Sequence, residues 1–287
     1  EMIKRFHPDI PVILGGFSAT YYHEEILRNY PFVDFVMRGD STEKPLLQLL
    51  KNLKGKREFK DIPNLTYRDG GNGIRANPIT YVPEDLNDIT IDYRHMMKKV
   101  VRFMDPVGYQ PFIDWYSYPV TAVFTCRGCI YHCKTCGGSS RTFRSMANRT
   151  KPAYRDPKLL AQDIFNISDH LNAPIMIIGD IFQPGEEYGN TFLREMKKKP
   201  TDNHIAFEFF VPPSRDQLER IAESIKNFNI EISPESHDEE VRKAFGRPYA
   251  NSPMEKMIAD AIELGCKRID LFFMIGLPKQ TYQSVME

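Results

Sequence analysis

The sequence predicts an α/β protein with a parallel sheet in its C-terminal part, and three observations describe how the chain is organised. Apolar segments recur at regular intervals from residue 120 onward and alternate with helical segments. Two shorter strand–helix pairs open the chain, and four of its five cysteines fall within a single short segment. Successive strand–helix units form a parallel sheet through right-handed crossovers, either open or curled into a barrel.

The opening strand–helix pairs both end their strands on glycine. The segment "PVILGG" at residues 11–16 precedes a helical stretch at 21–29, and "VDFVMRGD" at 33–40 precedes a second at 42–53. The strand ends carry Gly15, Gly16 and Gly39. Ligands bind at the carboxyl ends of strands in open sheets, and glycine lets the backbone approach them closely. Tight strand–helix turns would also explain these glycines.

Residues 57–117 have the character of a linker between a first domain, residues 1–56, and a last domain, residues 118–287. A glycine-rich turn at 69–73 lies between two alternating segments, which predicts a hairpin. The aromatic segment "FIDWYSYP" at 112–119 contains the only tryptophan, and its composition favours packing in a core or between domains.

Five strands are expected in the last domain, at residues 120–126, 174–180, 204–211, 229–236 and 268–276. The starts of the intervening helices carry recognisable signals. Asp156 precedes a proline, and "SRDQ", "SHDE" and "SPME" at residues 214–217, 236–239 and 252–255 match the capping box. Proline is expected at the first helical position after Asp156 and after Ser252.

Charge and hydropathy exclude two classes of protein. The chain has 38 basic and 38 acidic residues and no basic stripe, which argues against a nucleic-acid binder. It has no apolar run of about 18 residues and no signal peptide, so we expect a cytoplasmic protein. It begins with Glu1, within what reads as a helix, and ends soon after a turn. We therefore expect it to be part of a longer protein.

The clustered cysteines indicate a metal site, because disulfide-bonded domains distribute their cysteines along the chain. They are Cys126, Cys129, Cys133 and Cys136. A zinc site usually separates its two C-x2-C pairs by a dozen or more residues, and ferredoxins order their cysteines differently. Without Cys126 the spacing is C-x3-C-x2-C. Three such thiolates can hold three irons of a cubane cluster and leave the fourth iron open to a substrate.

This pattern, placed after the first of several strand–helix units, resembles the radical S-adenosylmethionine superfamily. Its hallmark is C-x3-C-x2-C after the first strand of a partial (β/α)6 barrel, of which about five units are expected here. The resemblance implies that Cys129, Cys133 and Cys136 hold a [4Fe–4S] cluster. The residue before the third cysteine is Thr135, where the family usually has an aromatic residue near the adenine.

Further segments are similar to the motifs with which this family binds S-adenosylmethionine. "IIGD" resembles its glycine-glycine-acid motif, with isoleucine in place of the first glycine, and "ISPES", "FGRP" and "GLP" resemble motifs of later strands. The residues that the resemblance assigns to S-adenosylmethionine are Gly179, Asp180, Glu235, Ser236, Arg247 and Gly276.

The front of the chain resembles the second half of the Rossmann-like cobalamin-binding domain that precedes many radical enzymes. The resemblance implies that Gly15, Gly16 and Gly39 border the nucleotide tail of cobalamin. Asp40 stands where that family usually has glutamate. The loop that would ligate cobalt is expected upstream of Glu1, so this chain alone should bind cobalamin weakly.

The resemblance implies reductive cleavage of S-adenosylmethionine to a 5'-deoxyadenosyl radical, which abstracts hydrogen from an unactivated carbon. In cobalamin-dependent relatives, methyl transfer commonly follows. A reductant such as ferredoxin or flavodoxin is implied as a partner. No motif identifies the substrate, whether small molecule or protein.

An iron–sulfur electron-transfer protein and a metal-stabilised binding protein, both without S-adenosylmethionine cleavage, remain alternatives. Cys126 is either a small, partly buried thiol or a fourth cluster ligand.

Overall fold

The computed structural model describes residues 1–70, 73–104 and 120–286, and it divides the chain into two compact units. The first unit contains residues 1–84, 128–132 and 136–153, and the second contains the other described residues. The elements of the first unit are α1 (Met2–Phe6), β1 (Ile13–Leu14), α2 (Phe17–Tyr21), α3 (His23–Asn29), β2 (Phe35–Met37), α4 (Glu43–Lys54), β3 (Leu65–Asp69), β4 (Gly73–Ala76) and α6 (Ser140–Ala147).

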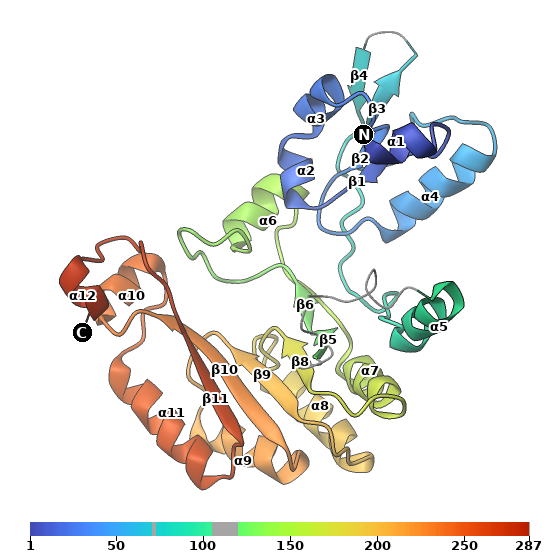
Figure 1. Cartoon of the computed structure of the whole chain (residues 1–287). Helices are drawn as coiled ribbons and strands as arrows, with labels where there is room; N and C mark the ends of the chain where they lie inside the picture. The colour runs from blue at the N-terminus through green and yellow to red at the C-terminus, as the bar shows by residue number, and fades with distance from the viewer. Residues whose placement is uncertain (71–72, 105–119, 287) are drawn as a thin grey trace. The chain divides into compact units, whose positions relative to one another are not determined.

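The first unit is built on a four-stranded sheet in the order β1-β2-β3-β4 (Figure 1). β1 and β2 are parallel, whereas β3 pairs antiparallel with both β2 and β4. The hairpin expected in the linker is therefore hydrogen-bonded to the sheet of the first unit. Its turn residues Gly71 and Asn72 lie outside the described residues.

Strand β2 is buried on both faces. Phe35 and Met37 pack with Leu49 of α4, while Val36 packs with Leu27 of α3. Successive side chains of a strand point to opposite faces, so three apolar residues in a row supply both cores. Because β2 is buried on both faces, its sequence is an uninterrupted apolar run, and this run is what predicted the strand.

The second unit contains a five-stranded sheet in the order β11-β10-β9-β8-β5, and all four strand pairs are parallel. The predicted α/β fold is confirmed. The elements that lie wholly in this unit are α5 (Tyr93–Phe103), β5 (Thr121–Phe124), β6 (Cys126–Arg127), α7 (Pro157–Ser168), β8 (Ile175–Ile178), α8 (Glu186–Lys198), β9 (Ile205–Phe209), α9 (Arg215–Ser224), β10 (Phe228–Glu235), α10 (Glu239–Phe245), α11 (Asn251–Glu263), β11 (Arg268–Phe273) and α12 (Tyr282–Met286). The boundary of the units falls within β7 (Ala153–Tyr154).

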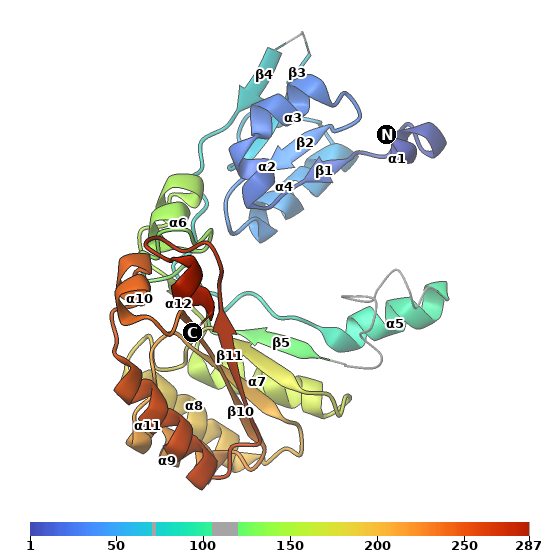
Figure 2. The same ribbon diagram turned by 60° about the vertical axis from the view of Figure 1, so that its left-hand side comes forward.

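One face of the parallel sheet carries the core. Helices α7, α8, α9 and α11 lie along this face (Figure 2). Alternate strand residues such as Ile177, Phe207 and Ile230 are buried in this core. The intervening residues, including Glu208 and Glu231, project from the opposite face, since the side-chain period of a strand is two. The sheet thus leaves a face that contains polar residues opposite its helices.

β5 lies at the edge of the sheet, and a tyrosine side chain forms hydrogen bonds with the backbone on its unpaired side. The Tyr93 hydroxyl accepts a hydrogen bond from the Ala122 amide (2.8 Å) and donates one to the Ala122 carbonyl (3.2 Å). Tyr93 is the first residue of α5, so this bond anchors the helix to the edge of the sheet.

The helix starts agree with the sequence in two cases and differ in two. Asp156 caps α7 with proline at its start, and Ser214 forms a capping box with Gln217 at α9. The cap of α10 is Asp238 and not Ser236. Helix α11 begins at Asn251, so the capping box predicted at Ser252 and the proline at the first position are wrong.

Hydrogen bonds between α10 and the start of α11 explain why the two predicted capping boxes do not form. The Glu239 carboxylate, expected to bond back to Ser236, instead accepts a hydrogen bond from the Asn251 amide (2.7 Å). The Asn251 side-chain oxygen accepts from Arg242 (2.5 Å). Both bonds fix the start of α11 before the serine that carries the local signal.

Membrane-spanning helices are not found within residues 1–70, 73–104 and 120–286, because none there has the required length and apolarity. The aromatic segment at 112–119, with its single tryptophan, lies outside the described residues. The domain boundaries expected at residues 56–57 and 117–118 stay predictions.

Candidate functional site

The cysteine loop follows the first strand of the parallel sheet. Cys133 is buried, Cys129 is partly buried and Cys136 is exposed, and none of them forms a disulfide. The Tyr131 amide donates a hydrogen bond to Cys129 Sγ (3.4 Å), and the Gly138 amide donates one to Cys136 Sγ (3.3 Å). Amide donors to cysteine sulfur are one of the means by which proteins tune iron–sulfur clusters.

The middle of the loop is held in the second unit. The amide of Lys134, next to Cys133, donates to the carbonyl of Phe245 at the end of α10 (2.9 Å). Within the described residues, no three His, Cys, Asp or Glu side chains form a ready metal-binding group. The donor set nevertheless fits an iron–sulfur cluster, because three thiols without disulfides lie on one loop and two receive backbone amides.

The end of β8 lies directly against the end of β5. Gly179 has a φ of +92°, and a Cβ there would come within 2.2 Å of Thr125 Oγ1 and 3.3 Å of Cys126 Sγ. Thr125 Oγ1 donates to the Ile178 carbonyl (2.9 Å). Glycine is therefore required at 179 for the close approach of these strand ends. The Cys126 thiol packs beside it, and its possible role as a ligand stays a prediction.

Two carboxylates lie beside Gly179. Asp180 is 5% exposed and accepts from the Phe182 amide (2.8 Å), and burial raises its pKa to about 6. Glu208 of β9 accepts from the Gly179 amide (2.7 Å). Burial also raises the pKa of Glu208, against the opposing effects of the Gly179 bond and of Arg247. Our sequence analysis missed Glu208, although it is the one charged residue within β9.

The structure brings together two residues that the sequence assigned separately. Glu235 has a φ of +67° and ends β10 after a register shift that begins at Ile232. Its carboxylate lies 3.4 Å from Arg247 Nη2, and the side chains of Glu235 and Arg247 are 8% and 10% exposed. Burial raises the pKa of Glu235, and the Arg247 charge opposes this shift.

One of the hydrogen-bond donors of Arg247 is not used within the described residues. Its Nη1 donates to the Phe210 carbonyl (2.9 Å), and its guanidinium lies over the Phe210 ring, 5.3 Å from the centroid. Among the described residues, its Nε is buried and has no hydrogen-bond partner. An unpaired buried donor is costly, so this atom is suited to bind an acceptor group of a ligand.

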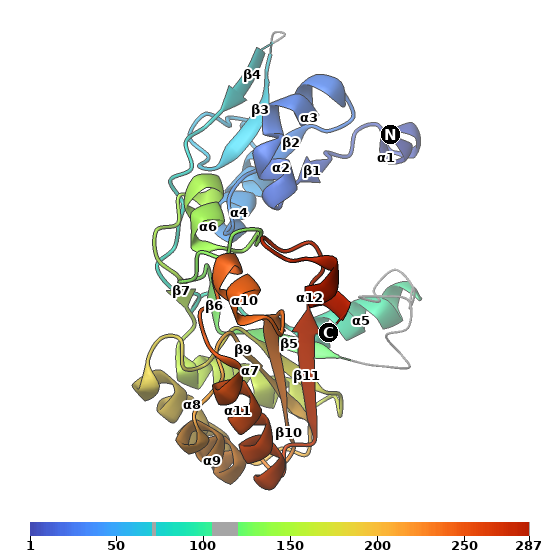
Figure 3. The ribbon, with the colours of Figure 1, turned by 90° about the vertical axis from the view of Figure 1, so that its left-hand side faces the viewer.

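Ser236 and Gly276 have local roles in the structure. Ser236 Oγ accepts from the Asp238 amide (3.2 Å) in the turn that leads to α10. Gly276, with a φ of +91°, donates its amide to Gln280 Oε1 (2.7 Å), and Gln280 Nε2 donates to the Met274 carbonyl (2.9 Å). Both residues follow strand ends of the second unit; Figure 3 shows α10 and α12 beyond the ends of β10 and β11.

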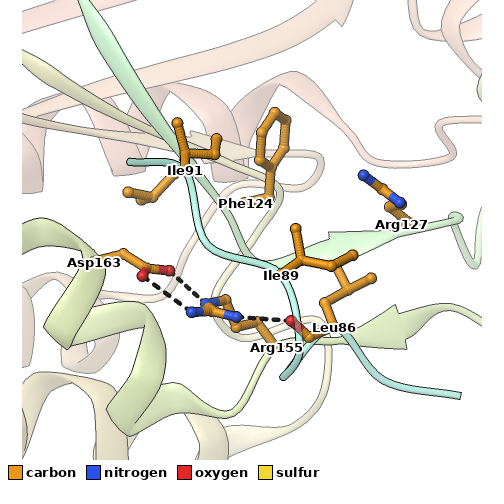
Figure 4. Close-up of a pocket in the computed structure, with 8 residues that line it drawn as sticks. Leu86, Ile89, Ile91, Phe124, Arg127, Arg155 and Asp163 are labelled. Carbon is orange, nitrogen blue, oxygen red and sulfur yellow. Dashed lines mark hydrogen bonds and ion pairs between the residues drawn. The ribbon is translucent and has the colours of Figure 1, made fainter. Parts of the chain in front are cut away.

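A small pocket lies beside β5 and is shown in Figure 4. Arg155 pairs with Asp163 and donates to the Leu86 carbonyl (2.7 Å), which fastens the segment before α5 onto α7. The cavity has a volume of about 20 Å³, enough for a single water molecule. It is far too small for a nucleoside, and its charged pair is structural. The residues that line it are Leu86, Ile89, Ile91, Val123, Phe124, Arg127, Arg155 and Asp163.

In the first unit the glycines at two strand ends are joined by one side chain. Thr20 Oγ1 donates to the Gly16 carbonyl (2.9 Å) and accepts from the Gly39 amide (3.0 Å). Gly16 and Gly39 both have positive φ, at +91° and +95°. Gly15 leaves room for a side chain, since a Cβ there would lie 3.6 Å from the Met37 carbonyl. Thr20 has no sequence signal that distinguishes it from other threonines.

Comparison with known families identifies the superfamily to which the segment with the cysteine loop belongs. The model of the radical SAM superfamily matches residues 123–287. The chain belongs to the radical SAM superfamily. Membership in this superfamily implies a [4Fe–4S] cluster and S-adenosylmethionine as cofactors.

Solved structures of two radical SAM proteins share the fold over nearly the whole chain. The methyltransferase TsrM from Kitasatospora setae matches with a TM-score of 0.72, 16% identity, 96% of this chain and 52% of its own. The cobalamin-dependent S-adenosylmethionine radical enzyme OxsB matches with a TM-score of 0.67, 13% identity, 95% of this chain and 38% of its own.

Curated relatives match shorter stretches. An uncharacterised methyltransferase of Pyrococcus horikoshii is 27% identical over 139 residues, which cover 48% of this chain and 28% of that protein. The anaerobic magnesium-protoporphyrin IX monomethyl ester cyclase of Rubrivivax gelatinosus is 25% identical over 185 residues, which cover 63% of this chain and 30% of that protein. The chain thus spans less than a third of these relatives.

Proposed function

We propose that this chain carries the cluster-binding and S-adenosylmethionine-binding part of a cobalamin-dependent radical SAM enzyme, and that the enzyme transfers a methyl group. The observation that carries the proposal is the C-x3-C-x2-C loop after β5, in which the sulfurs of Cys129 and Cys136 accept backbone amides. The loop lies within the residues matched by the superfamily model.

Cys129, Cys133 and Cys136 would each supply one thiolate to the cluster, which would leave one iron free to bind S-adenosylmethionine. When bound and reduced by one electron from an external donor, the cluster would supply that electron for cleavage of the C5'–S bond of S-adenosylmethionine, which gives methionine and the 5'-deoxyadenosyl radical. The protein's own part is to hold the sulfurs and to orient the substrate.

The residues at the strand ends suit the polar groups of S-adenosylmethionine. Arg247 Nε is a buried donor that has no partner in the part of the chain that the structure describes, and it would donate to the methionine carboxylate. Asp180 lies next to Gly179, and its ionised carboxylate would accept from the ammonium group. A cation close to Asp180 would lower its raised pKa and favour the ionised form.

The cobalamin part of the proposal rests on the first unit and on the relatives. Gly16 and Gly39 are held together by Thr20 at the ends of two parallel strands, where ligands bind in such sheets. The OxsB structure was solved with cobalamin, and TsrM is described as a methyltransferase. Methyl transfer and cobalamin binding by this protein are carried over from these likenesses.

The test is anaerobic reconstitution of the chain with iron and sulfide, followed by reduction and assay for 5'-deoxyadenosine. We expect about four irons per chain and a visible absorption band, as the three-cysteine cluster requires. The assay is run with and without methylcobalamin, and with the Cys133→Ala variant as control. A reconstituted chain that forms a cluster but no 5'-deoxyadenosine would favour an electron-transfer protein instead.

A further inference from the structure

A buried arginine of the first unit connects loops that are far apart in the sequence. Arg149 follows α6, and its side chain is 3% exposed. Its Nε and Nη2 donate to the two carboxylate oxygens of Asp40, which is 5% exposed. Its Nη1 donates to the Pro83 carbonyl (2.9 Å), and Nη2 also donates to Ser41 Oγ (3.2 Å). A guanidinium with this many planar bonds is held in one position.

Gly128, which begins the cysteine loop, packs against the Arg149 side chain. Gly128 has a φ of +98°, and a Cβ there would come within 2.8 Å of Arg149 Cδ and 3.0 Å of Pro152 Cα. Only glycine fits such an approach. Gly128 directly precedes Cys129, whose sulfur accepts the Tyr131 amide. The backbone therefore enters the ligand loop across a surface that Arg149 provides.

The other end of the loop is fixed in the same unit. The Cys136 carbonyl accepts from the Ser139 amide (3.2 Å) and from Thr142 Oγ1 (3.3 Å), which ties it to the first turn of α6. At the end of α6, Asn148 Nδ2 donates to the Ile79 carbonyl (2.9 Å). The helix that joins Cys136 to Arg149 is thus bonded at both ends.

We propose that the Asp40–Arg149 ion pair positions Cys129 for iron binding. The identity of the bound group rests on the proposed function, but the positioning rests on contacts within the first unit. Asp40 follows Gly39, which the proposed function puts beside cobalamin, so the pair links that loop to Cys129. Asp40 and Arg149 are positioning residues, and Asp40 is too well paired to serve as a ligand itself.

The first experiment needs no metal and compares amide hydrogen exchange in the apo chain and its Asp40→Asn variant. We expect exchange across residues 128–132, including the Tyr131 amide, to accelerate at least about tenfold, because a local contact is lost. Exchange in α4 around Leu49, in the same unit, should change much less. The control is Arg144→Gln, an exposed arginine of α6. Equal acceleration at both places, or none at 128–132, would overturn the proposal.

The second experiment measures iron per chain and the electron paramagnetic resonance spectrum of the reduced cluster. The Asp40→Asn variant should load about half the iron of the parent or give an altered spectrum, because one ligand of three is displaced. The double variant Asp40→Asn with Arg149→Met removes the unpaired buried charge, so its unfolding midpoint should recover while iron loading does not.

Full iron loading with an unchanged spectrum in both variants would refute the positioning role. If the parent chain takes up no iron, the proposed function fails, whereas hydrogen exchange at residues 128–132 still decides the role of the ion pair.

Discussion

At the scale of single residues, the site is marked by carboxylates that are costly to ionise. Asp180 is nearly fully buried, and desolvation raises its pKa from an ordinary value of 3.8 to about 6. Glu208 and Glu235 are shifted in the same direction, also mainly by burial. Perturbed pKa values cluster at functional sites, where burial and neighbouring charges act together.

The Asp180 shift predicts how stability depends on pH in the apo chain. The folded chain holds this proton more tightly than the unfolded chain, so stability falls as pH rises from about 4 to about 6. Asp180→Asn keeps an oxygen for the Phe182 amide and removes the charge. The variant should be more stable than the parent at pH 7.5 by roughly 2–3 kcal/mol and similar to it near pH 4. Thermal unfolding at both pH values checks this, with exposed Asp202→Asn as control.

Cys126 allows a second prediction at this scale. Its thiol packs beside Gly179, as expected of a small, partly buried side chain. A Cys126→Ser chain should keep the iron content and S-adenosylmethionine cleavage of the parent and lose about 1 kcal/mol of stability at most. Iron analysis and the 5'-deoxyadenosine assay test this. Loss of about a quarter of the iron, or faster cleavage, would identify Cys126 as a fourth ligand.

At the scale of elements, a local sequence signal sets a helix start only when its partners are not taken elsewhere. The box of Ser214 and Gln217 forms at α9, whereas Glu239 bonds to Asn251 and so prevents the box expected at Ser236. Helix α11 begins at Asn251, one residue before Ser252, because the Glu239 carboxylate accepts a hydrogen bond from the Asn251 amide.

Two serine substitutions separate these cases. Ser214→Ala removes a cap and should lower the free energy of unfolding by about 1 kcal/mol. Ser252→Ala replaces an exposed residue inside the first turn of α11, and it should change stability by less than about 0.5 kcal/mol. Urea denaturation of both variants measures the difference. Equal losses would mean that Ser252 acts as a cap after all.

At the scale of the whole molecule, each unit has a hydrophobic core of its own. Leu49 is fully buried in the first unit and Ile230 in the second. Multi-domain chains commonly unfold in more than one step. Leu49→Ala and Ile230→Ala should each destabilise their own unit by about 2–5 kcal/mol. Hydrogen exchange should accelerate in the substituted unit and remain near the parent value in the other. Acceleration of both units by either substitution would contradict independent cores.

The sequence by itself determined the fold class and the superfamily. Strands β8, β9 and β10 lie between helices and bury at least every second residue against one layer of helices, which leaves a clear apolar pattern in the sequence. Cys129, Cys133 and Cys136 could be predicted as ligands because residues on one short loop keep a fixed spacing in the sequence. The superfamily match covers this whole region.

Only the tertiary structure decided which polar groups face one another. Glu208 is bound to Gly179, and Glu235 to Arg247, across strand ends whose separation in the sequence says nothing about their contact. The same holds for Asp40 and Arg149, which are 109 positions apart. A buried charge needs a partner, but its partner can come from any segment that the fold brings near, so such pairs leave no periodic signal in the sequence.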